Sequence, residues 1–484
     1  MRQRFDLQLK IGQTPISEIY INPKSKNALE QLVAALKEIY CNEEYNKKIF
    51  SIIEKYLPNV DHNNGRPGMN LWTIFVLGQV RMCLDMSYDM LHYHANNDRL
   101  LRKLIGIIDE FGVESITFEY QNIYDNVSKL SDAMLVEIND VIVEFGHRDV
   151  FKKKEDSVLH LKTDSFVLES NVHFPTDYNL LWDCARKCLD VVEYFIEKYP
   201  QLSGWRKLKN WRSALKGMMR EVGRISKSGG KNKDEKLQKA TTLYLDKCRL
   251  LQHKLVFEKK YFPVNTEIDL AKHCALDHYI KLFIKHIDLV DRRILKGERI
   301  PHEEKVMSIF ETYTEWVAKG KSRPIVELGK KVSITSDQFG LILFHKIMNN
   351  EQDRDIVVEI ADNVLHKYKS VASISLDKGH WSANNKALLE LEIPLVVLPK
   401  LGRRTAEEKE FESSRNFKRF KNKHSAIESN INELEHRGLD RCPDRGYFHF
   451  CNYVAMGICA YNLKKIGKKI LENQLKELPD KKVA

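Results

Sequence analysis

Three acidic residues, Asp164, Asp377 and Glu428, occupy sequence contexts from which carboxylates could converge on one site. Asp164 lies within residues 157–183, the first part of which alternates apolar and polar side chains as a β-strand does. A carboxylate inside such a strand is costly to desolvate unless a cation or a hydrogen-bond donor compensates it. The alternative for Asp164 is a structural role, in which nearby backbone amides donate to its carboxylate.

The other two acids also have structural alternatives. Asp377 follows the predicted strand 371–376, and open α/β sheets place ligand sites at the carboxyl ends of their strands. Because Gly379 comes two residues later, a turn-forming Asp377 is the alternative. Glu428 lies on a predicted helix, where Ser425 three residues earlier makes a capping box the alternative.

Together the three acids suggest phosphoryl-transfer chemistry. Carboxylates from two strands and a helix that converge on one edge can hold two divalent ions about 3.5–4 Å apart. Such a pair activates a water or a 3′-hydroxyl and stabilises the leaving oxygen during in-line displacement. Mg²⁺ suits this role because it is a hard ion that prefers oxygen ligands and keeps exchangeable waters. We therefore expect two Mg²⁺ or Mn²⁺ ions as cofactors.

The composition of the chain predicts a globular protein with two or three domains. It has 484 residues, of which 43% are hydrophobic and 30% charged. Its 78 Lys and Arg exceed its 67 Asp and Glu, an excess of +11 that suits a polyanionic partner. Its longest apolar runs, such as 393–398, are too short to span a bilayer, and the N-terminus lacks the apolar core of a signal peptide. With nine cysteines and no C-x-x-C pair, we expect a cytoplasmic protein.

The elements before and after the Asp164 strand are predicted from apolar periodicity. Helical patterns over 27–56, 69–84 and 88–104 fit either a helix-turn-helix DNA reader or a plain helical bundle. A long helical insertion follows the strand. We expect its many charges to be solvated, and the alternative is a basic surface that tracks phosphates. The insertion's helices are predicted at 180–199, 205–224, 234–257 and 268–296.

Strand patterns return after the insertion. Residues 332–335 and 341–347 flank a hairpin turn, a short strand is predicted at 371–376, and an apolar strand at 393–399. Helical patterns cover 356–368 and 382–390, and a last helix follows. This order predicts a mixed sheet with helices on its faces.

At these residues the sequence resembles DDE transposases of bacterial insertion sequences, most closely the ISNCY type. The resemblance covers residues 65 to 467. Its most specific parts are TDSFVLESNVHFPTDYNLLWD around Asp164, SISLDKGHWSANNKALL around Asp377, and the stretch from Glu428 through GLDRCPDRGYFHFCNYVAMGICAYNLKKIG. It also includes GRPGMNLWTIFVLGQVRMCLDMSYDMLHYHANND near the N-terminus. The resemblance implies that Asp164, Asp377 and Glu428 are the catalytic residues and the metal ligands.

The resemblance also implies the fold and the domain organisation. It implies an α/β fold with an RNase H-like mixed sheet and a large helical insertion, preceded by an all-α N-terminal region. The expected domains are a helical terminal-repeat-binding region at 1–150, a catalytic core divided between 151–182 and 329–467, the insertion at 183–328, and a basic tail at 468–484.

The function implied is that of a DNA transposase. Such a protein binds the terminal inverted repeats of its element and catalyses metal-dependent cleavage and strand transfer. Its expected partners are double-stranded DNA, both terminal repeats and target, and a second copy of itself when the ends are synapsed. The alternatives are a catalytically silent DNA-binding protein derived from a transposase and a metal-dependent nuclease of the same fold.

A basic stretch at 400–423 directly precedes the Glu428 helix and predicts contact with the DNA backbone, the alternative being a solvated charge run. Related transposases often carry a Lys seven residues after the catalytic Glu, where this chain has Glu435. Arg437 or Arg441 would have to supply that phosphate contact. The residues expected to bind DNA are Arg66, Arg403, Arg404, Arg415, Lys418, Arg419, Lys421 and Lys423.

Overall fold

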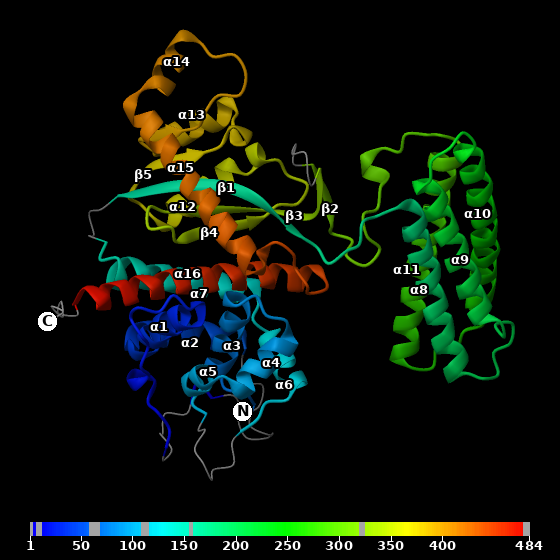
Figure 1. The fold of residues 1–484 in the computed structure, drawn as a ribbon, viewed down its shortest axis with the longest axis horizontal. Helices are drawn as coiled ribbons and strands as arrows, with labels where there is room; N and C mark the ends of the chain where they lie inside the picture. The colour runs from blue at the N-terminus through cyan, green and yellow to red at the C-terminus, as the bar shows by residue number, and fades with distance from the viewer. Residues whose placement is uncertain are drawn as a thin grey trace. The chain divides into compact units, whose positions relative to one another are not determined.

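The computed structural model describes residues 3–5, 12–57, 68–107, 116–153, 158–318 and 325–477 (Figure 1). The chain forms two compact units. The first is discontinuous and consists of Met1–Asn171 together with Glu315–Ala484. The second, Val172–Thr314, begins and ends earlier in the chain than the insertion expected at 183–328.

The first unit contains a six-stranded mixed sheet, which confirms the α/β class and the mixed sheet predicted from the sequence. The strand order is β2-β3-β1-β5-β6, and β4 also pairs with β3. Strand β1 is antiparallel to β3 and parallel to β5, and β5 is parallel to β6. The strands are β1 (Leu159–Glu169), β2 (Glu315–Ala318), β3 (Val326–Ser336), β4 (Ile342–Ile347), β5 (Val371–Leu376) and β6 (Leu395–Val397).

Strand β1 is the central strand and buries apolar side chains on both of its faces. Leu161 and Val167 are buried on one face, and Phe166 and Leu168 are buried at neighbouring positions. The alternation of the sequence therefore describes only the first half of the strand. The sequence of a strand that is paired on both edges and covered on both faces is typically a nearly continuous run of apolar residues.

Helices fill the rest of the first unit, and the described residues before β1 contain helices but no strand. The N-terminal helices are α1 (Ala28–Cys41), α2 (Glu43–Tyr56), α3 (Leu71–Cys83), α4 (Tyr88–Asn97), α5 (Arg99–Leu104), α6 (Tyr120–Val127) and α7 (Asp132–Phe145). Those that follow the sheet's first strands are α12 (Val357–Lys367), α13 (Ala383–Glu392), α14 (Ala406–Ser413), α15 (Arg415–Leu434) and α16 (Tyr447–Glu477).

The long helix α16 joins the N-terminal helices to the sheet. It packs against α1, α3 and α7 and also contacts β4 (Figure 1). Its Asn462 is fully buried, and the side-chain amide donates to Asn139 Oδ1 at 2.8 Å and to the Ile342 carbonyl at 2.9 Å. The Ile342 amide donates back to Asn462 Oδ1 at 2.9 Å. These bonds satisfy buried polar groups of α7, α16 and β4 at once.

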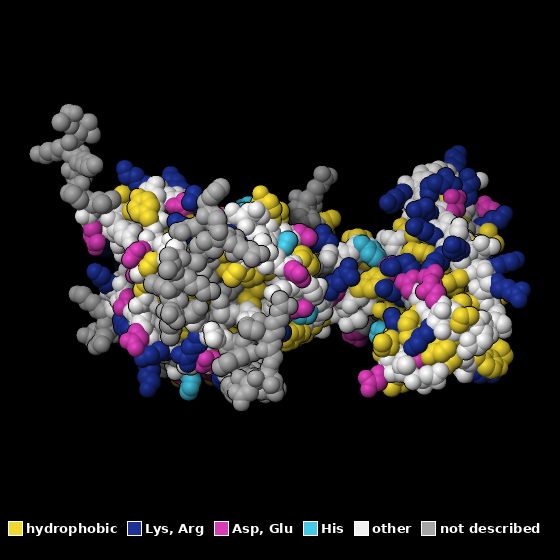
Figure 2. Space-filling model, turned by 90° about the horizontal axis from the view of Figure 1, so that it is seen from below, with side chains coloured by type: hydrophobic (Ala, Val, Ile, Leu, Met, Phe, Trp, Pro, Cys, Tyr) yellow, Lys and Arg dark blue, Asp and Glu magenta, His cyan; other side chains and the backbone are white. Residues whose placement is uncertain are grey.

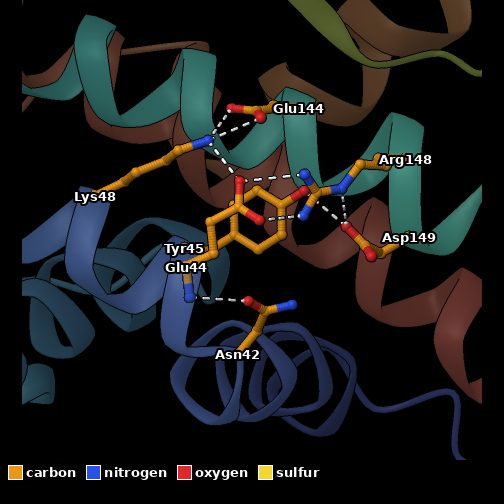
Figure 3. A network of polar contacts seen from close by, with 7 residues as sticks. All are labelled: Asn42, Glu44, Tyr45, Lys48, Glu144, Arg148 and Asp149. Atoms are coloured by element: carbon orange, nitrogen blue, oxygen red, sulfur yellow. Dashed lines mark hydrogen bonds and ion pairs between the residues drawn. The ribbon is translucent and has the colours of Figure 1, made fainter. Parts of the chain in front are cut away.

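A network of charged side chains connects α2 to the end of α7 (Figure 3). Lys48 Nζ lies 2.9 Å from Glu44 and 2.8 Å from Glu144, and Arg148 Nη2 lies 2.7 Å from Glu44. Hydrogen bonds from Arg148 and Lys48 lower the pKa of Glu44 to about 2. Because these side chains are well exposed, the ion pairs contribute little to the free energy of unfolding.

The second unit is a bundle of four helices. Helix α8 packs against α9 and α11, and α10 packs against α9 and α11, so α9 and α11 occupy opposite corners. Leu189, Phe195, Tyr244 and Phe283 lie in its core. The helices are α8 (Asp177–Lys198), α9 (Leu208–Lys227), α10 (Lys233–Glu258) and α11 (Glu267–Val290).

No helix in the described part of the chain combines the length and the apolar character needed to cross a membrane.

The first prediction concerns the contact between α1 and α16. A Cβ atom at Gly467 would overlap the backbone carbonyl of Gln31, so Gly467→Ala must push the two helices apart. We expect a loss of about 1–3 kcal/mol in the free energy of unfolding. Gly217→Ala is the matched control, because Gly217 lies in exposed helix α9 with no atom near the added methyl group. It should stabilise by about 0.5–1 kcal/mol. Equal effects of the two substitutions in chemical denaturation would contradict the predicted close packing.

Candidate functional site

Parallel pairing of β1 with β5 brings Asp164 beside Asp377. The register aligns Thr163 with Leu376, and each acid is the next residue along its chain. Asp164 is half-buried in the middle of β1, whereas Asp377 directly follows β5. The sheet geometry therefore brings these two residues together; that they form a functional site stays a prediction.

Ionisation of the Asp164 carboxylate is unfavourable in the folded protein. Burial raises its pKa to about 6, and the negative charges of Asp377 and Asp353 act in the same direction. The Ser165 backbone amide donates to Asp164 Oδ1 at 2.8 Å and opposes this shift. The structural alternative for Asp164 is thus present as a hydrogen bond, but that bond does not compensate the burial.

The pKa of Asp377 shifts in the opposite direction. Burial works to raise its pKa, but the hydrogen bond and charge of His380 outweigh burial, so the pKa is lowered. His380 is fully buried, and its Nδ1 is hydrogen-bonded to Asp377 Oδ1. The Gly379 amide also donates to Asp377 Oδ1, at 3.0 Å, which is the turn expected as the alternative. One site thus holds two carboxylates that titrate in different pH ranges.

Asp353 is a third acid in this neighbourhood, and it was not predicted from the sequence. It begins the 3-10 turn Asp353–Asp355. Its Oδ1 accepts a hydrogen bond from Ser165 Oγ at 2.7 Å, and Lys331 Nζ lies 3.0 Å from its Oδ2. Asp353 follows no strand and belongs to no recognisable motif, so only the folded sheet reveals its proximity to Asp164.

The capping-box alternative for Glu428 is wrong. Helix α15 begins eleven residues earlier than that alternative requires, with Ser414 accepting from the Phe417 amide at 3.3 Å. Ser425 therefore lies in mid-helix, where its hydroxyl donates to the Asn422 carbonyl at 2.9 Å. Glu428 is exposed on α15, and this helix packs against β1 and β5.

His424 lies one helical turn before Glu428 and connects α15 to the site. Its Nδ1 is 3.1 Å from Ser375 Oγ on β5. Burial lowers the pKa of His424, while the charges of Asp377 and Glu428 both oppose that shift. The side chain thus lies within the electrostatic reach of two of the three predicted acids.

Two buried imidazole nitrogens at this site were not predicted from the sequence. In the described part of the chain, neither His380 Nε2 nor His424 Nε2 has a hydrogen-bond partner. Their spacing offered a signal, because His380 follows Asp377 by three residues and His424 precedes Glu428 by four. Side chains at such spacings share a helix face or a turn.

Among the described residues, no three His, Cys, Asp or Glu side chains lie close enough together to form a metal site. The structure thus brings Asp164 and Asp377 together and leaves Glu428 on the adjoining helix. Two carboxylates nevertheless fit one Mg²⁺, since this ion is commonly held by one or two carboxylates with water and substrate phosphates completing its shell. A cation between Asp164 and Asp377 would also stabilise the Asp164 carboxylate, whose pKa is raised mainly by burial and further by the charge of Asp377.

The residues expected to bind DNA lie mostly on the first half of α15. Arg403 is also exposed, but Arg404 pairs with Glu412 at 2.8 Å and is only partly accessible. Arg66 lies outside the described residues. The exposed cations of α15 are Arg415, Lys418, Arg419, Lys421 and Lys423, and the described residues place no acidic side chain within ion-pair distance of them.

The two arginines proposed to supply the phosphate contact of the missing Lys differ in how exposed their side chains are. Arg437 is partly buried, and its Nη1 donates to the Cys83 carbonyl at the end of α3, at 2.9 Å. Arg441 is exposed, with a long contact of 3.4 Å to Asn171. Of the two, Arg441 has the more exposed side chain.

No protein-family model matches this chain, and neither the curated proteins nor the solved structures contain a match to it.

The second prediction follows from the raised pKa of Asp164. Its folded-state pKa lies near 6, above its ordinary value of 3.8, so the fold favours the neutral acid. The stability that this neutral form contributes is present below pH 3.8 and is lost as the pH rises through 6. Asp164→Asn removes the ionisation and keeps an acceptor for the Ser165 amide. In metal-free buffer at pH 8 the variant should melt about 1–3 °C above the wild type.

The control for this prediction is the same comparison at pH 4, where the advantage should disappear because Asp164 is protonated in the folded wild type. A melting difference that does not change between pH 4 and pH 8 would show that Asp164 ionisation does not destabilise the fold.

Proposed function

We propose that this protein is a DDE-type DNA transposase, in which an RNase H-like core cleaves DNA strands and transfers them with the help of Mg²⁺ or Mn²⁺. The observation that carries the proposal is the pairing of β1 with β5, which sets Asp164 beside Asp377. The mixed sheet is consistent with an RNase H-like core, since its central strand is flanked by an antiparallel hairpin on one side and parallel strands on the other. The helix that carries Glu428 packs on those same strands.

The chain's own residues have separable roles in this proposal. Asp164 and Asp377 would hold the metal, and His380 positions Asp377 through a hydrogen bond from within the core. The bound metal supplies Lewis-acid activation of the attacking oxygen and charge stabilisation of the leaving oxygen. Glu428 lies one turn beyond His424 on α15, from where it would complete the acid set once DNA is bound. The exposed cations of α15 would hold the DNA backbone next to these acids.

End recognition is proposed for the N-terminal helices. Helix α3 buries all of its residues and is therefore a supporting helix. Helix α4 exposes Asp89, Met90, Tyr93 and Asn97 along one face, including side chains able to contact base edges. This helix is the better candidate for reading terminal inverted repeats, and synapsis of two ends would bring two copies of the chain together.

Two other functions use the same fold. In a binding protein that has lost catalysis, a buried Asp164 with an unfavourable charge would serve no function. The raised pKa of Asp164 therefore favours the enzyme over the binding protein. A metal-dependent nuclease would cleave without joining. Incubation of pre-cleaved terminal-repeat DNA with a plasmid separates the two enzymes, because only a transposase produces strand-transfer products.

The third prediction is that Asp164→Asn and Asp377→Asn each lower Mg²⁺-dependent DNA cleavage on the order of 10³-fold, because a neutral amide does not hold a hard cation. DNA binding in EDTA should stay within about twofold of the wild type. The measurement is single-turnover cleavage of a labelled duplex that carries a terminal repeat. Cleavage by either variant near the wild-type rate would remove that acid from the proposed site.

Glu428→Gln tests the third acid, and the same large loss of cleavage is expected. Glu435→Gln is the matched control, since Glu435 lies two turns further along, about 10 Å away by helix rise. Glu433 is a poor control because it is ion-paired with Lys464. If Glu435→Gln loses cleavage while Glu428→Gln keeps it, the third ligand is Glu435.

The fourth prediction concerns the basic residues of α15. Replacement of Lys418, Arg419 and Lys421 with Ala should flatten the plot of log affinity against log salt by about 2–3, because each phosphate contact contributes about 0.9 to the slope. Fluorescence anisotropy with a terminal-repeat duplex measures this slope. An unchanged slope would mean that these side chains are solvated and do not touch DNA.

A further inference from the structure

The net charge of the chain is concentrated in one short part of the helical bundle. Residues 206–239 contain twelve Lys and Arg but three Asp and Glu, a net charge of +9 out of the chain's +11. The remainder of the bundle, 172–205 and 240–314, has sixteen of each sign and is neutral. This segment comprises α9, the connection after it and the start of α10. In Figure 2 dark-blue side chains outnumber magenta ones on the bundle face in view.

The cations of α9 form a stripe along one side of the helix. Lys209, Lys216, Arg220 and Lys227 follow one another at spacings of seven, four and seven residues, which places them on one face. All four are exposed. From Lys209 to Lys227 the stripe spans about 27 Å by helix rise. It is therefore a straight, rigid row of positive charge.

These cations are not neutralised by the bundle, which the structure describes throughout. The acids near α9 are already used: Glu221 pairs with Arg224, and Asp190 and Glu193 of α8 pair with Arg212. The four stripe residues have no ion pair within the bundle. Surface helices usually intersperse acids at i+4 to offset such repulsion, and like charges at that spacing destabilise the helix. Folding alone gives no reason for the stripe.

The middle of the stripe is open to close approach. Gly217 follows Lys216 in mid-helix, and a Cβ atom there would meet nothing within 4 Å. Ser213 is exposed on the same face, between Lys209 and Lys216. Small side chains between long basic ones leave room for a backbone to lie against the helix.

We infer that the α9 stripe is a second DNA-binding surface, which holds the phosphate backbone of duplex DNA without regard to sequence. A row about 27 Å long matches about eight base pairs of duplex, given one base pair per 3.4 Å. Duplex DNA is a uniformly charged rod and is therefore complementary to a straight row of basic side chains. A protein partner would need apolar side chains to pack against, and the row offers none. The inference goes beyond the proposed function, because it requires neither metal nor catalysis.

The test compares two full-length variants with equal changes in net charge. The first carries Lys209→Gln, Lys216→Gln, Arg220→Gln and Lys227→Gln. The second is the matched control, with Lys260, Lys281, Lys285 and Lys305 changed to Gln; these lysines are exposed on the bundle and none of them lies on α9. Affinity for a labelled random-sequence 30-base-pair duplex is measured by anisotropy in EDTA at several NaCl concentrations, so cleavage plays no part.

The stripe variant should lower the salt slope by about 3–4 and weaken binding at 0.1 M NaCl at least about tenfold, while the control changes the slope by less than about 1. Equal slopes for the two variants would overturn the inference. So would competition by poly-glutamate as effective, per charge, as duplex DNA, because the stripe would then recognise acidic polypeptides.

A variant in which Lys209, Lys216 and Lys227 are changed to Arg keeps the charge and should keep the wild-type slope. If it binds as weakly as the Gln variant, the loss comes from disturbance of α9 and the inference fails. Failure of the wild type to cleave DNA with Mg²⁺ would contradict the proposed function and leave these binding results unaffected.

Discussion

The fold depends on one strand that is paired on both of its edges. Strand β1 pairs with β3 over eight aligned positions, Lys162 to Glu169, and with β5 from its other edge. This double pairing places β3 and β5 on either side of β1, and helix α15 packs against both β1 and β5. A shift of one residue in β1 would turn Asp164 to the opposite face of the sheet. The candidate site is thus a consequence of strand register.

The centre of this strand is polar where packing alone would favour apolar residues. Thr163 shares a hydrogen bond of 2.8 Å with Thr335 of β3, Asp164 bears a raised pKa, and Ser165 bonds Asp353. Each of these groups is satisfied by a neighbour except the Asp164 charge. A local conflict of this kind, inside a sheet that is otherwise consistent, is expected at functional sites. A bound cation would relieve this conflict, which would link the energetics of the sheet to the proposed chemistry.

Sequence patterns predicted the site only where its determinants are local. Asp377 could be placed at a strand end because β5 is a short strand that directly precedes it. Asp353 could not be assigned to the site, since tertiary pairing alone brings it near Asp164. The three-residue spacing of His380 from Asp377 was a signal, but it does not show that His380 is buried. Ser425 was misleading because a capping motif has meaning only at a helix start, and α15 begins at Arg415. The RNase H-like core stays a prediction from resemblance.

The insertion of a whole helical bundle into this sheet has a simple geometric basis. Glu169, at the end of β1, and Glu315, at the start of β2, both pair with Gly329 of β3 from opposite sides. The chain therefore leaves and re-enters the sheet at points about 10 Å apart, two strand spacings. A Cβ atom at Gly329 would overlap the Leu168 carbonyl, so glycine keeps this junction closely paired. Because the ends of the bundle need span only this short gap, the sheet tolerates the insertion without a change in register, and the bundle's charged surface can vary independently of the sheet.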